Sequence, residues 1–146
     1  MKQIAVPVFL ALVAAACGGT ASPAASPSPK PLVFQVQQEN ASGVGGTVEV
    51  LKASASFTLT WKLKGLAPNS GHISHIHKGH CPNQPGTVAY ALTVVQADGS
   101  GNSVGSATVQ TDYVVPDTGW YANAHAGPDL QGGNAKSIAC AELANR

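Results

Sequence analysis

Short strand-like runs recur about every ten residues from Leu32 to the C-terminus, and this spacing constrains the fold more than any other feature. In the clearest run, residues 57–63 (FTLTWKL), apolar side chains alternate with polar ones. This is the period-2 pattern of a strand with one buried face. No run keeps the 3.6-residue period of an amphipathic helix. The chain is therefore expected to be all-β.

Eight runs are predicted as strands: residues 32–38, 46–51, 57–63, 72–77, 87–96, 104–109, 120–124 and 137–143. Turns rich in glycine and proline separate them, and the chain has 16 Gly and 10 Pro. Many short strands joined by such turns favour an antiparallel sandwich or a flattened barrel.

The charge balance excludes two classes of protein. Lys and Arg total 8 and Asp and Glu total 7, which gives a formal net charge of +1. Without a basic excess there is nothing to hold a phosphate backbone, so nucleic acid is not expected as a partner. Charged residues make up only 10% of the chain, too few for a solvated, disordered protein.

The N-terminus has the pattern of an export signal. Lys2 precedes an apolar run over residues 4–16 (IAVPVFLALVAAA), which is shorter than the roughly 20 residues of a membrane-spanning helix and fits a signal peptide. The following AAACGG resembles the bacterial lipobox, in which the cysteine becomes the lipidated first residue, although Ala14 stands where leucine is usual. Residues 1–16 are predicted as a lipoprotein-type signal peptide and Cys17 as the lipidated residue.

Residues 17–31 are predicted as the lipidated cysteine and a Pro/Ser/Ala-rich tether, because GGTASPAASPSPKP has no large apolar side chain to bury. Residues 32–146 then form one domain, held by Cys17 at the outer face of the bacterial cytoplasmic membrane. The alternative, a Cys17 buried in an ordinary helical core, does not suit a residue followed by such a segment.

With Cys17 assigned to the lipid, Cys81 and Cys140 remain. In an exported domain such a pair is most simply one disulfide. It would close a loop of about 60 residues, worth roughly 4 kcal/mol in the chain-entropy model. The alternative is two free thiols.

The five histidines all lie in the predicted domain. His75 and His77 are two apart on a predicted strand, so their imidazoles share one face and form a candidate pair of metal ligands. His125 on a second strand is the candidate third ligand, or else a hydrogen-bonded structural residue. Asp129, four residues on, either fixes the tautomer of His125 or caps a glycine-rich turn.

Two further histidines are less clearly placed. His80 is either a fourth ligand or an ordinary loop residue. His72 has the opposite strand parity from His75 and is expected in a turn or edge contact. Imidazole ligands suit copper and zinc, and the affinity order favours Cu(II), so we expect one copper ion.

Two segments carry a family resemblance. Residues 64–81 (KGLAPNSGHISHIHKGHC) resemble the copper-ligand strand of Cu/Zn superoxide dismutases, and residues 125–140 (HAGPDLQGGNAKSIAC) resemble the C-terminal part of the same family. The resemblance implies an eight-stranded antiparallel Greek-key β-sandwich or flattened barrel and a Cys81–Cys140 disulfide. It also implies that His75, His77 and His125 are copper-ligand equivalents.

The departures from this family bear on activity. No histidine stands between His80 and His125, so the bridging imidazole and a separate zinc site are not expected. The family's catalytic arginine is missing, and Lys136 is the nearest cation that could steer superoxide to the site.

A second family shares the compact form. Residues 120–125 (WYANAH) resemble the Tyr-x-Asn-x-His strand of CHRD (chordin-type) domains. The sequence therefore leaves two hypotheses: a membrane-anchored copper-binding protein of superoxide dismutase type, with superoxide as its substrate, and a non-enzymatic CHRD-type surface domain. A hydrolase is not expected, because the domain has no candidate carboxylate pair.

Overall fold

The computed structural model describes residues 28–81 and 86–146. The predicted signal peptide, Cys17 and most of the tether lie outside this part. Within it, no helix is long and apolar enough to cross a membrane. The described residues form ten strands and one 3-10 helix: β1 (Leu32–Gln38), β2 (Gly45–Ala53), β3 (Ser56–Lys64), β4 (Gly71–His72), β5 (Ser74–Lys78), β6 (Val88–Ala91), β7 (Val95–Gln96), β8 (Ser103–Val109), β9 (Trp120–His125), η1 (Gly132–Ala135) and β10 (Ser137–Leu143).

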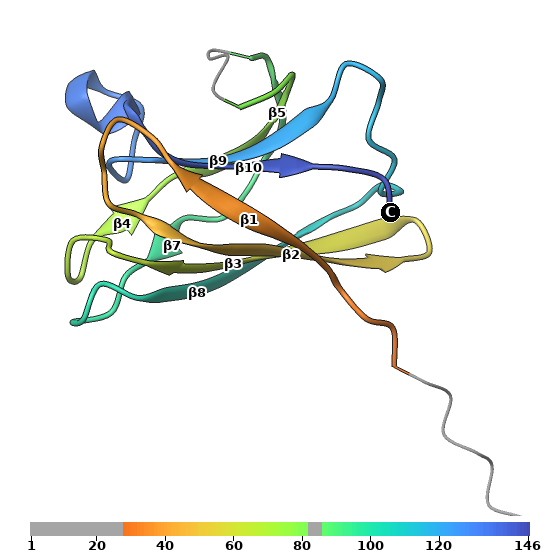
Figure 1. The fold of residues 1–146 in the computed structure, drawn as a ribbon, viewed down its shortest axis with the longest axis horizontal. Helices are drawn as coiled ribbons and strands as arrows, with labels where there is room; N and C mark the ends of the chain where they lie inside the picture. The colour runs from red at the N-terminus through yellow and green to blue at the C-terminus, as the bar shows by residue number, and fades with distance from the viewer. Residues whose placement is uncertain (1–27, 82–85) are drawn as a thin grey trace, which may run out of the picture.

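Eight of these strands form a single antiparallel sheet in the order β6-β5-β9-β10-β1-β2-β3-β8. The sheet curls into a nearly closed barrel (Figure 1). β4 and β7 form a separate two-stranded sheet. The predicted all-β, eight-stranded antiparallel fold is confirmed.

Two predicted strands are each divided in the structure. The run 72–77 separates into β4 and β5 at Ile73, whose N–H donates to the Gly127 carbonyl and whose carbonyl accepts from the His125 N–H. The run 87–96 separates into β6, which pairs with β5, and β7, which pairs with β4. Neither run contains a glycine or a proline, so the sequence does not show where each strand ends and the chain begins to pair with a different strand.

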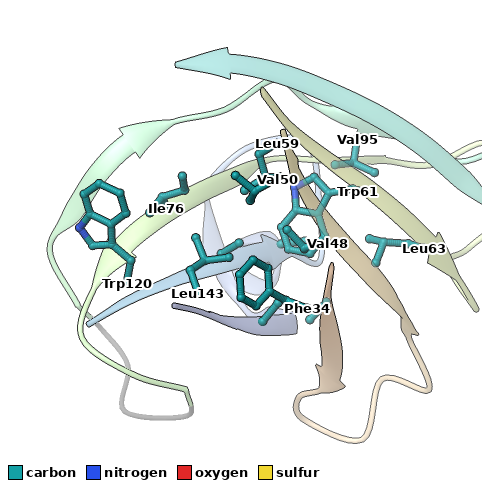
Figure 2. Packing of buried hydrophobic residues seen from close by; sticks show 14 of the residues in the cluster. Phe34, Val48, Val50, Leu59, Trp61, Leu63, Ile76, Val95, Trp120 and Leu143 are labelled. Atoms are coloured by element: carbon teal, nitrogen blue, oxygen red, sulfur yellow. The ribbon is translucent and has the colours of Figure 1, made fainter. Parts of the chain in front are cut away.

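The core lies inside the barrel. Phe57, Leu59, Trp61 and Leu63 of β3 are all buried, as their alternation predicted. They pack with apolar residues of β2 and with Ile76 of β5 (Figure 2). Because Ile76 points inward, its neighbours on β5 point to the outer face of the barrel.

Candidate metal centre

The pairing of β5 with β9 brings together histidines that are 50 residues apart. In the antiparallel register His75 lies opposite Asn123 and His77 lies opposite Tyr121. Since alternate residues of a strand share a face, His125 of β9 falls on the same outer face as the two histidines of β5. The crossover topology of the barrel therefore builds the cluster.

The three imidazoles converge. One ring nitrogen from each of His75, His77 and His125 lies within 4.8 Å of the other two. His75 Nδ1 is 3.4 Å from His125 Nε2. The planes of the His75 and His77 rings are nearly perpendicular, at 89°. The three residues are only 6%, 6% and 7% exposed, so the cluster is buried although its side chains point away from the barrel core.

Backbone carbonyls fix the tautomers of two of these rings. His77 Nδ1 is 2.8 Å from the Gly86 carbonyl oxygen, and His125 Nδ1 is 2.8 Å from that of Ala135. Because a carbonyl can only accept, each Nδ1 carries the proton, and the lone pair of the neutral ring is on Nε2. His77 Nε2 is buried and has no hydrogen-bond partner among the described residues. Such an orphaned buried atom calls for an explanation, and a bound ion supplies one.

The electrostatics of the cluster favour neutral rings. Burial lowers the pKa of His75, and the neighbouring His125 and His77 lower it further. Burial also lowers the pKa of His77, against the opposing effect of its hydrogen bond to Gly86. Both rings are therefore neutral at neutral pH, the state that binds a metal ion.

The residues present fit a metal ion. Two nitrogens that each bind one ion at about 2 Å lie roughly 3.4 Å apart, and the nitrogens of His75 and His125 are 3.4 Å apart. Three imidazole ligands suit copper or zinc. His75, His77 and His125 would hold the ion, and within residues 28–81 and 86–146 no fourth metal-ligating side chain joins the cluster.

His80, the candidate fourth ligand, lies elsewhere. Its Nδ1 is 3.2 Å from Glu142 Oε2 on β10, and its side chain is exposed. The structure therefore places His80 in a loop contact and not with the other three histidines.

Asp129 caps the glycine-rich turn. Its Oδ1 accepts hydrogen bonds from the Gln131 N–H and from Asn134 Nδ2, each at 2.9 Å. These bonds lower the pKa of its carboxyl, the Asn134 bond most. The Ala135 carbonyl, and not this carboxylate, accepts the proton of His125 Nδ1. Lys136 follows at the surface, exposed.

His72 is a residue whose role the sequence did not indicate. It is 3% exposed, its Nδ1 donates to the His125 carbonyl at 2.9 Å, and its Nε2 is 2.6 Å from Ser70 Oγ. It therefore holds the backbone of a candidate ligand. On one continuous strand His72 would point to the opposite face from His75, so the sequence placed it apart from the other histidines. No sequence motif marks a side chain that binds the carbonyl of a distant residue.

A disulfide joins Cys81 to Cys140, with the two Cα atoms 6.1 Å apart. Cys140 lies on β10, opposite Asn123 of β9. The disulfide therefore ties the segment that follows β5 to the sheet that carries the third histidine.

No protein-family model matches the chain. No curated protein matches it either. Among solved structures, it is similar to the crystal structure of a double mutant of a SOD-like protein from Bacillus subtilis, with a TM-score of 0.57 and 17% sequence identity, over 77% of this chain and 97% of that one. At this identity the likeness shows the fold alone. The fold is thus SOD-like, as the sequence resemblance predicted, and it carries a three-histidine cluster that could hold a metal ion.

Proposed function

We propose that the chain is an exported, membrane-anchored copper-binding protein of superoxide dismutase-like type, in which His75, His77 and His125 hold one copper ion. The observation that carries this proposal is the convergence of three buried imidazole nitrogens, one of them orphaned. Copper is the preferred ion because imidazole sites bind Cu(II) more tightly than Zn(II).

A bound copper ion would supply one-electron redox chemistry, and superoxide dismutation is the activity implied by the family resemblance. The three histidines leave a position for a small anion. The positive charge of Lys136 would raise the local concentration of such an anion.

Titration of the full chain with Cu(II), followed by electron paramagnetic resonance, tests the proposal. The experiment uses a Cys17→Ser background, because that thiol would itself bind copper. We expect one copper per chain, with hyperfine splitting from several nitrogens. The absence of nitrogen splitting at stoichiometric copper would exclude the site.

The second candidate is a non-enzymatic CHRD-type surface domain. The short connection between Cys81 and β6 favours it, because this connection carries no histidine to bridge a second metal. An assay of superoxide dismutation separates the two candidates. Under the first, the copper-loaded chain is faster than its His125→Ala variant at equal copper; under the second, the two rates are equal.

The anchor is tested separately. We expect the chain, expressed in a bacterium, to fractionate with membranes and to incorporate labelled fatty acid. Cys17→Ser removes the thiol that the lipid would occupy, so this variant is expected to lose the label and to leave the membrane fraction. A labelled Cys17→Ser protein would refute the assignment of this cysteine.

A further inference from the structure

Tyr121 of β9 lies directly against His77. The two residues are opposite one another in the β5–β9 register. Their rings are stacked, with centroids 5.0 Å apart and planes 9° from parallel. Tyr121 is 0% exposed, so its ring has little freedom to turn. The phenol ring therefore sets the plane in which the imidazole lies.

The hydroxyl of the same tyrosine reaches the residue that fixes the His77 tautomer. The Gly86 N–H donates to Tyr121 Oη at 3.0 Å, and the Gly86 carbonyl accepts from His77 Nδ1 at 2.8 Å. Tyr121, Gly86 and His77 thus form a closed ring of contacts. A Cβ on Gly86 would lie 2.1 Å from the Lys78 carbonyl oxygen and 2.9 Å from Tyr121 Oη, so only glycine fits this close approach.

The opposite end of the same connection is held by the cross-strand neighbour of Tyr121. Glu142 of β10 lies opposite Tyr121, and its Oε1 accepts from the Cys81 N–H at 2.6 Å. One cross-strand pair therefore binds both Cys81 and Gly86. The carbonyl that accepts the His77 proton is held to the sheet and not left to loop motion.

We propose that Tyr121 is a positioning residue of the site: its ring and its hydroxyl together hold His77 in the plane and tautomer that direct Nε2 toward His75 and His125. This inference rests on the proposed copper function, because positioning Nε2 matters only if that atom binds the ion. The stacking fixes the ring plane, and the Tyr121–Gly86 hydrogen bond fixes the acceptor for Nδ1. Neither contact is needed for a histidine that only fills space.

Nuclear magnetic resonance of the imidazole nitrogens in the metal-free full chain tests this inference without copper. Tyr121→Phe keeps the ring and removes the hydroxyl. It is expected to admit the Nε2–H tautomer of His77 and to speed exchange of the Nδ1 proton by roughly fivefold to tenfold, the worth of one hydrogen bond. Tyr113→Phe is the matched control, because Tyr113 is also buried but its hydroxyl donates to the distant Ala144 carbonyl. The control should leave the His77 signals unchanged.

Copper affinity supplies the second measurement. Tyr121→Phe is expected to weaken Cu(II) binding by roughly fivefold to tenfold and to change the nitrogen splitting, whereas Tyr113→Phe should do neither. If the chain in the Cys17→Ser background binds copper and Tyr121→Phe in the same background matches it in tautomer and affinity, the inference is overturned and the copper function stands. If the chain in the Cys17→Ser background binds no copper, the copper function fails, and the tautomer of His77 in the metal-free chain then decides whether Tyr121 positions this ring.

Discussion

Replacement of His125 by alanine is expected to weaken Cu(II) binding by at least about 100-fold. The substitution removes one of three converging nitrogens, and His75 Nδ1 loses the neighbour that lies 3.4 Å away. The two remaining imidazoles are neighbours on one strand and cannot enclose an ion. Calorimetric titration in the Cys17→Ser background measures the loss.

The matched control is His80→Ala, which removes an exposed imidazole whose contact is with Glu142 and not with the three clustered histidines. Its affinity should stay within about twofold of the unmodified chain, well inside the effect of one hydrogen bond. A second variant, His125→Asn, places an amide N–H near the position of Nδ1, so it keeps a donor for the Ala135 carbonyl and guards against simple misfolding. Full affinity in either His125 variant would remove this residue from the ligand set.

The part of the site that the sequence could predict is the part encoded by strand parity. His75 and His77 are two residues apart, so any strand places them on one face, and the alternation in 57–63 predicts a buried β3 in the same way. His125 could be added because it lies on a second predicted strand and because residues 125–140 resemble the C-terminal part of Cu/Zn superoxide dismutases. The two-residue alternation of buried and outward-facing side chains in these segments is therefore what made the all-β fold predictable.

The rest of the site depends on the backbone of distant segments. The acceptors for His77 and His125 are the carbonyls of Gly86 and Ala135, and every residue has a carbonyl, so no residue type marks them. Asp129 was the visible candidate for such a role because carboxylates can be recognised in a sequence. The structure bears out the other predicted role of Asp129, because its carboxylate caps the turn from which the Ala135 carbonyl is presented.

Loss of the disulfide is expected to cost about 4 kcal/mol of unfolding free energy. Cys81 and Cys140 are 59 residues apart, and a crosslink over a loop of this length restricts the unfolded chain strongly. The Cys81→Ser/Cys140→Ser double variant leaves no free thiol in the Cys17→Ser background. For a domain of this size the thermal midpoint should fall by about 15 °C or more, measured with a chelator present so that bound metal does not stabilise the folded state.

The same double variant separates stability from site geometry. The crosslink acts mainly on the unfolded chain, and the backbone N–H of residue 81 can still donate to Glu142 Oε1 in the double variant. The folded protein should therefore keep its histidine geometry. Its Cu(II) affinity, measured well below the lowered midpoint, is therefore expected to stay within about twofold, less than the effect of one hydrogen bond. A loss of affinity as large as that of Tyr121→Phe would instead mean that the disulfide positions the connection that carries Gly86.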